Sequence, residues 1–161
     1  MAYLDIITLA EAKVYLRVDD TLTEDDNTIV RMINAAFTWI ENTTNVHVIQ
    51  KDKVYDVIDG LVRIYDYPIN SDLSLLTDYV FTKKGLYYVV CDDTGATTEL
   101  TLDIGTIDPV NVSPELVQVA YEIIEYYYNQ SKDDTKKGTT ITEALSPMSM
   151  EFINTNRRFF L

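Results

Sequence analysis

The sequence predicts an α+β fold that is mainly helical: a small bundle of about four helices, with a subdomain of antiparallel β-hairpins inserted between the second and the third helix. Two observations favour it. Segments with helical spacing and capping signals lie at both ends of the chain, whereas short β-rich runs fill the middle. At 161 residues the chain suits one domain. We expect a helical core at 8–45 and 113–131, a β insertion at 46–106, a linker at 132–146, and a docking helix with its tail at 147–161.

Two helices are expected at the start of the chain. Thr8 and Glu11 form a T-x-x-E capping box, which predicts a helix over residues 9–18. Thr23 is the expected N-cap of a second helix that ends near Asn42, because three carboxylates in its first turn complement the helix dipole. The polar residues of this second helix trace one narrow stripe, so most of its circumference is apolar.

The middle of the chain carries strand and turn signals. Asp59-Gly60 separates two alternating runs, which predicts a hairpin, and Gly85 separates the next two. A fifth run ends at Gly105. The expected result is a small antiparallel sheet.

The final third returns to helix. Ser113 is the expected N-cap of a third helix with Pro114 at its first position, and the polar stripe of this helix is again narrow. A polar, glycine-containing stretch follows and predicts a flexible connection. Pro147 then begins a short last helix that leads to the C-terminal arginines.

Charge and hydropathy argue against several functional classes of protein. Thirteen basic and 26 acidic side chains give a formal charge of −13, which argues against tight binding to a nucleic-acid backbone. No apolar run approaches the roughly 18 residues of a membrane span. The N-terminus has no basic region typical of a secretory signal, so we expect synthesis in the cytoplasm.

No catalytic or metal-binding motif stands out. The nucleophile elbow, the zincin helix and the P-loop are all missing from the sequence. The single histidine, His47, is expected to pack at a boundary, and the single cysteine, Cys91, excludes an internal disulfide. We therefore expect no cofactor, no metal and no enzymatic activity. A hydrolase built on carboxylates from distant segments remains an alternative, with its candidates at Asp25, Asp26, Asp92 and Asp93.

Two aromatic runs have two open readings. Tyr126-Tyr127-Tyr128 and the end Phe159-Phe160-Leu161 suit ordinary core packing, but Tyr, Phe, Met and Arg are also enriched in the cores of interfaces.

Together these segments resemble the small head-tail connector (adaptor) proteins of tailed bacteriophages, in particular the longer members with an inserted β-subdomain. The opening "ITLAEAKVYLRVDDTLTEDDNTIVRMINAAFTWIENTTN" is similar to the first two helices of that family. The segment "VSPELVQVAYEIIEYYYNQ" is similar to its third helix, and "LSPMSMEFINTNRRFFL" to its closing helix with terminal arginines. The resemblance spans nearly the whole chain through the order and spacing of weak motifs.

The resemblance implies a structural virion protein of the phage neck. About twelve copies would form a ring that binds the portal protein on one side and a stopper or tail protein on the other, while DNA passes through without specific binding. The acidic composition suits a channel that repels the passing genome. A tail-completion or baseplate subunit, or another adaptor module, is the alternative.

The resemblance also implies two sets of contact residues. The broad apolar faces of the second and third helices would supply the contacts between subunits, and the C-terminal helix with its tail would grip the portal. The inter-subunit candidates are Val30, Phe37, Trp39, Tyr121, Tyr126 and Tyr128. The portal-docking candidates are Met148, Phe152, Ile153, Arg157, Arg158, Phe159, Phe160 and Leu161.

Overall fold

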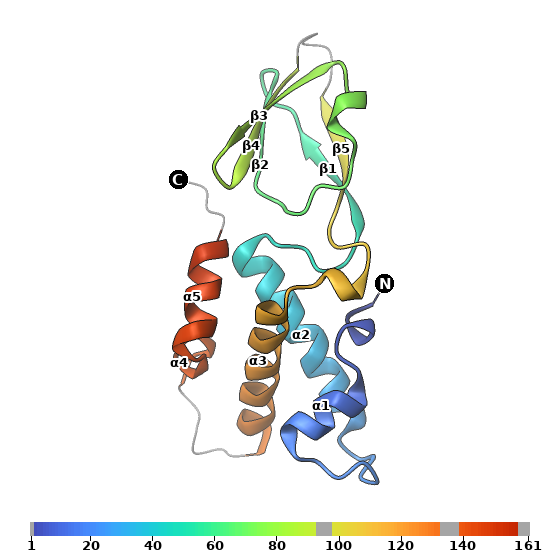
Figure 1. The fold of residues 1–161 in the computed structure, drawn as a ribbon, viewed down its shortest axis with the longest axis vertical. Coiled ribbons are helices and arrows are strands. Elements are labelled where there is room, and N and C mark those ends of the chain that lie inside the picture. The colour runs from blue at the N-terminus through green and yellow to red at the C-terminus, as the bar shows by residue number, and fades with distance from the viewer. Residues whose placement is uncertain (1, 93–97, 133–138, 158–161) are drawn as a thin grey trace.

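A helical domain and a β subdomain are stacked end to end in the computed structural model, which describes residues 2–92, 98–132 and 139–157 (Figure 1). The α-helices are α1 (Leu9–Leu16), α2 (Asp26–Thr44), α3 (Pro114–Lys132), α4 (Ile141–Ala144) and α5 (Pro147–Asn156). The strands are β1 (Lys51–Asp56), β2 (Leu61–Ile64), β3 (Tyr79–Lys84), β4 (Tyr87–Asp92) and β5 (Glu99–Ile104). The predicted α+β class, mainly helical with a β insertion between α2 and α3, is confirmed.

The helical domain is built on the packing of α2 against α3. α2 runs toward the β subdomain and α3 runs away from it, with α1 and α5 packed on this pair (Figure 1). The core between α2 and α3 consists largely of fully buried side chains. From α2 these are Ile29, Ile33, Ala36, Phe37 and Ile40, and from α3 they are Val119, Ala120, Ile123 and Ile124.

The predicted N-cap of α1 is confirmed, whereas the predicted N-cap of α2 is wrong. Thr8 Oγ1 accepts from the Glu11 amide at 3.2 Å, and Glu11 Oε2 accepts from the Thr8 amide at 2.8 Å. α2 begins at Asp26, three residues after the expected cap Thr23. The reason is Lys13, which is 4% exposed and whose ammonium lies 2.5 Å from Asp26 Oδ1.

Lys13 also organises the turn before α2. Its Nζ donates to the Leu22 carbonyl at 2.7 Å and to the Asp20 carbonyl at 3.3 Å. A buried ammonium needs such partners. Residues 19–25 therefore wrap around this side chain as a turn.

The C-terminal part differs from the expected linker. Ser113 caps α3 as predicted, since its Oγ accepts from the Leu116 amide at 3.2 Å. Thr140 and Glu143, however, form a second T-x-x-E capping box, which starts α4 inside the segment expected to be a linker. Residues 133–138 of that segment lie outside the described residues.

The strands form two antiparallel sheets, which corrects the expected single sheet. Asp59 and Gly60 adopt left-handed conformations and make the expected tight turn, in which Ile58 and Leu61 exchange backbone hydrogen bonds of 3.1 and 3.0 Å. The backbone pairing between the two segments on either side of this turn does not extend beyond Ile58 and Leu61. β1 pairs with β5, while β2, β4 and β3 form the second sheet in that order, and the predicted hairpin through Gly85 joins β3 to β4.

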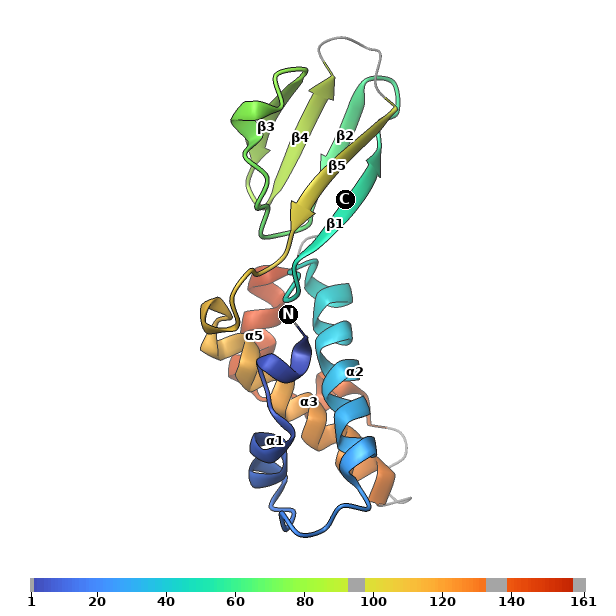
Figure 2. The same ribbon diagram turned by 90° about the vertical axis from the view of Figure 1, so that its right-hand side faces the viewer.

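The two sheets share one small core. Seven buried side chains form it: Tyr55, Val57, Leu100, Leu102 and Ile104 from β1, β5 and their ends, with Ile64 and Val90 from the other sheet. The strands of both sheets lie above the helices in Figure 2. This core is separate from the helical core, so the region between the two determines how the parts are held together.

Backbone hydrogen bonds join the two parts. The His47 amide donates to the Tyr67 carbonyl at 2.7 Å, and the Gly105 amide donates to the Pro68 carbonyl at 2.8 Å. Gly105 has φ +98°, and a Cβ built there would lie 2.2 Å from the Ile49 carbonyl oxygen. Only glycine allows these two segments to approach so closely.

We expect Gly105→Ala to lower the free energy of unfolding by about 3 kcal/mol or more, because it adds a clash with the Ile49 backbone to the strain of a positive φ. Gly85→Ala is the control, since Gly85 has φ +61° with no atom within 4 Å of the added Cβ. It should cost only the strain of about 1–2 kcal/mol. Equal losses in chemical denaturation would contradict the close packing at this junction.

Candidate assembly surfaces

A cluster of three buried ionisable side chains lies where the helices meet the β subdomain. His47, Glu41 and Asp66 are 6%, 7% and 5% exposed. His47 Nε2 makes a short contact with Asp66 Oδ1, and His47 Nδ1 lies 3.4 Å from Glu41 Oε2. The imidazole thus bridges the end of α2 and the segment that follows β2.

Further donors form hydrogen bonds with the carboxylate of Asp66. Lys53 Nζ donates to both of its carboxylate oxygens at 2.9 Å, and the Tyr55 hydroxyl donates to Oδ2 at 2.8 Å. Burial alone would raise the pKa of Asp66, but the bonds from His47, Lys53 and Tyr55 outweigh it and hold that pKa well below its usual range. Asp66 is therefore ionised wherever the protein is folded near neutral pH.

Glu41 attaches the same cluster to the backbone. Its Oε1 accepts from the Val48 amide at 2.7 Å, and Lys51 Nζ lies 3.5 Å from its Oε2. Burial works against the ionised form, yet the bonds from His47 and Val48 lower the pKa of Glu41. For His47, burial lowers the pKa, but the two carboxylates outweigh burial and the net effect is a raised pKa.

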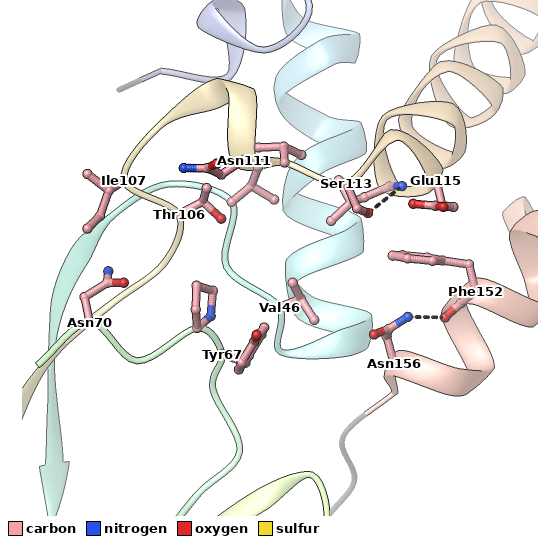
Figure 3. A pocket seen from close by; sticks show the side chains of 14 residues that line it. Val46, Tyr67, Asn70, Thr106, Ile107, Asn111, Ser113, Glu115, Phe152 and Asn156 are labelled. Atoms are coloured by element: carbon pink, nitrogen blue, oxygen red, sulfur yellow. Dashed lines mark hydrogen bonds between the residues drawn. The ribbon is translucent and has the colours of Figure 1, made fainter. Parts of the chain in front are cut away.

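A groove of about 450 Å³ opens beside this cluster, between the two parts of the molecule. We call it the junction groove (Figure 3). Its walls come from the segment that follows α2, the loops at 67–70 and 106–113, the start of α3 and the last two turns of α5. The lining residues are Val46, Val48, Tyr67, Pro68, Asn70, Thr106, Ile107, Asn111, Val112, Ser113, Glu115, Leu116, Phe152 and Asn156.

The lining of the junction groove is apolar and amide-bearing, with a single charge. Tyr67 and Ile107 expose 49% and 62% of their surface. Phe152 points into the groove from α5 toward the side that carries Glu115, and the Asn156 amide donates to the Phe152 carbonyl at 2.9 Å (Figure 3). Glu115 is the charged residue of the lining, so the groove suits apolar groups accompanied by a cation.

An apolar surface is formed by α1 and α3, and we call it the α1–α3 surface. It consists of Ala10, Glu11, Val14, Tyr15 and Tyr121. The rings of Tyr15 and Tyr121 stack with centroids 4.6 Å apart, and Val14 beside them is 70% exposed. An exposed aliphatic side chain next to stacked tyrosines is typical of an interface core.

A second surface, the α2–α3 surface, shares no residue with the first. It consists of Thr28, Arg31, Met32, Ala35 and Tyr127. Arg31 is exposed here, whereas Glu11 is the charged member of the α1–α3 surface. The two surfaces are therefore both apolar and carry opposite charges.

The sequence matches the family described as "Phage gp6-like head-tail connector protein" over residues 6–157. The chain belongs to this connector family. Members of the family are structural proteins of the phage particle, so this connector is a structural component of the head-tail junction. A search of curated proteins found no match.

Two solved structures share the fold of this connector. A chain in the "Virion of native gene transfer agent (GTA) particle" superposes with a TM-score of 0.67 at 14% identity, covering 97% of this chain and 91% of that one. A chain in the "Neck of empty GTA particle computed with C6 symmetry" gives a TM-score of 0.61 at 14% identity, covering 100% and 94%. At this identity the likeness shows the fold alone.

The structure distributes the inter-subunit candidates of the connector over different environments. Phe37 is fully buried in the helical core, so it is not available to a neighbour and we remove it from the set. Val30 and Trp39 are half-buried on α2. Tyr121 lies in the α1–α3 surface.

The other two tyrosines of that set make contacts within the chain. The Tyr126 hydroxyl donates to the Thr139 carbonyl at 2.7 Å, and the Tyr128 hydroxyl donates to Asp25 Oδ2 at 3.3 Å. Both side chains are half-buried. These bonds hold the segment before α4 and the turn before α2 against α3.

The portal-docking candidates also divide into core and surface. Ile153 is 1% exposed and belongs to the helical core, so α5 is part of the bundle rather than a detachable arm. Met148 is 63% exposed, Arg157 is exposed, and Phe152 lines the junction groove. Arg158, Phe159, Phe160 and Leu161 lie outside the described residues.

Sequence reasoning missed Val14 and Tyr15 and the whole junction groove. Val14 lies off the inner face of α1 set by Ala12 and Leu16, which is a signal that could have identified it. The groove has no such signal, because its walls come from segments far apart in the chain.

The carboxylates of the hydrolase alternative are not brought together. Asp25 and Asp26 lie at the start of α2, and Asp25 accepts from Lys132 Nζ at 2.8 Å. Asp92 ends β4 in the other subdomain, and Asp93 lies outside the described residues. Within the described ranges, no group of three or more His, Cys, Asp or Glu side chains is arranged to hold a metal ion, and no helix is long and apolar enough to cross a membrane.

His47 makes the stability of the connector depend on pH in a defined direction. Because its pKa is raised in the folded state, the folded protein binds the proton more tightly, and this stabilisation is lost as the pH rises through the folded pKa. We expect the free energy of unfolding to fall from pH 6 to pH 8, by at most about 1.4 kcal/mol per pH unit.

His47→Gln should flatten that slope, since His47 is the only histidine of the chain. Tyr55→Phe is the matched control, because it removes one bond to Asp66 but leaves the titrating group in place. Denaturant titrations at several pH values measure the slope. A slope that persists in His47→Gln would disprove the assignment to the cluster.

Proposed function

We propose that the chain forms a ring of about twelve subunits in the neck of a tailed-phage-like particle, where it binds the portal protein, joins the head to the tail, and leaves a channel for DNA. The observation that carries this proposal is the family match over residues 6–157. The same fold in a chain of a gene transfer agent neck supports it. The protein would be made in the host cytoplasm and act in the virion.

The ring would use the two helical surfaces as a head-to-tail pair. A closed ring needs two different patches on each subunit that fit one another. The α1–α3 and α2–α3 surfaces share no residue, and they place Glu11 and Arg31 in mainly apolar surroundings. In the proposed ring, Val14 and Tyr121 of one subunit pack on Ala35 and Tyr127 of the next, while Met32 belongs to the helical core.

The portal contact would come from the last residues of the chain. Since α5 is anchored in the core by Ile153, the proposed grip consists of the exposed Met148 and Arg157 together with residues 158–161. Charge-assisted hydrogen bonds from arginine to carboxylate are among the stronger polar contacts at interfaces. The proposed partner surface on the portal is therefore acidic with an apolar centre. On the opposite side of the ring a stopper or tail protein would bind.

The net charge supports the proposed channel. Each subunit carries −13, so a ring of about twelve would carry roughly −150 in total. A share of that charge facing the channel would repel the DNA backbone and prevent it from sticking.

Replacing both Arg157 and Arg158 by Glu should abolish binding to the portal protein of the same particle, because the reversed charges would face an acidic surface. The melting temperature should change by no more than a few degrees, since Arg157 is exposed. The matched control reverses Lys83 and Lys84, an exposed basic pair on β3. Pull-down with purified portal measures the effect. Undiminished binding by the arginine variant would refute the C-terminal grip.

A further inference from the structure

The end of the described chain lies at the junction groove. Phe152 and Asn156 are four residues apart on α5, so they share one helix face, and both line the groove. Arg157 follows Asn156 in an extended conformation, with φ −67° and ψ 115°. Arg157, the last residue that the structure describes, therefore directly follows the lining of the groove.

The reach of the remaining segment, Arg158–Leu161, matches the site. Four residues span at most about 14 Å when extended. A groove of about 450 Å³ falls within the size range of ligand pockets, which bury most of the surface of a bound group. The segment is long enough to enter the groove.

The chemistry of the segment matches the lining as well. Phe159, Phe160 and Leu161 are apolar, and Arg158 is a cation. The groove offers apolar walls with exposed Tyr67 and Ile107, and Glu115 is the charged residue that lines it. Aromatic side chains bury large areas and prefer such aromatic and aliphatic neighbours.

We propose that, in the free subunit, the C-terminal segment Arg158–Leu161 binds in the junction groove of its own chain. This inference rests on the proposed function, in which the same segment grips the portal. The groove then holds the segment until the portal competes for it, so the free subunit buries these apolar side chains and releases them only at the assembly site.

The test compares the full chain with one that ends at Arg157, by NMR of the backbone amides of Val46, Val48 and Leu116 in the groove. Deletion of the segment should shift these signals, and addition of the peptide Arg-Arg-Phe-Phe-Leu should shift them back. A tethered segment has an effective concentration in the millimolar range, so the full chain should bind the free peptide at least about tenfold more weakly than the shortened chain.

Two variants of the shortened chain distinguish binding of the peptide in the groove from nonspecific binding. Ile107→Asp should weaken peptide binding about tenfold, because it places a charge on the apolar lining. Val110→Asp is the matched control, since Val110 is 87% exposed, lies three residues further along and is not part of the lining. Equal weakening by both variants would overturn the proposal.

The remaining outcomes also show whether the segment occupies the groove of its own chain. If the groove signals do not move on deletion, or if full and shortened chains bind the peptide equally, the segment does not occupy its own groove; equal binding would assign the groove to a second copy or another partner. A portal pull-down with the shortened chain tests the grip on the portal independently of the binding of the segment in its own groove. Lost portal binding with unmoved groove signals would leave the grip intact and refute only the binding in the groove. Retained portal binding with shifted signals would refute the grip alone.

Discussion

The geometry of the whole molecule depends on the buried cluster of Glu41, His47 and Asp66. Taking ionisable groups out of water is unfavourable unless each finds partners, and these three find theirs in one another, in the neighbouring Lys51, Lys53 and Tyr55, and in backbone amides. That condition is met in one arrangement, in which the end of α2 meets the segment after β2. A cluster of this kind adds little net stability compared with an apolar core, but separating its members leaves uncompensated buried charges, which is strongly unfavourable.

The junction groove and the place of the β subdomain in the proposed ring follow from that orientation. The junction groove exists because the loops at 67–70 and 106–113 are held beside α3 and α5, and backbone bonds from His47 and Gly105 keep them there. The two helical surfaces are set at a constant distance from the β subdomain in the same way. A ring closes only if the rotation from one subunit to the next is the same at every step. A subunit that bent at the junction would not meet this condition for contacts made by both parts.

Local signals in the sequence predicted what is local in the structure. The capping box of α1, the Ser113-Pro114 start of α3 and the turns at Gly60 and Gly85 were all predictable, because the residues that make them lie within a few positions of one another. Long-range partners were not. β1 pairs with β5 rather than β2, although all three strands contribute side chains to one core, and a two-residue turn carries no information on which strand becomes the partner. Burial of Phe37 and Ile153 depends equally on which faces meet, and α4 was missed although Thr140 and Glu143 repeat the signal recognised at α1.

Electron microscopy of the chain mixed with the portal protein of its own particle tests the central claim most directly. The account predicts a ring stacked on the portal, with Val14 and Tyr121 of one subunit against Ala35 and Tyr127 of the next, and with the β subdomain in the same orientation to the helices in every copy. Portals without added density would contradict the connector ring. Rings in which both helical surfaces face solvent would contradict the assignment of the surfaces.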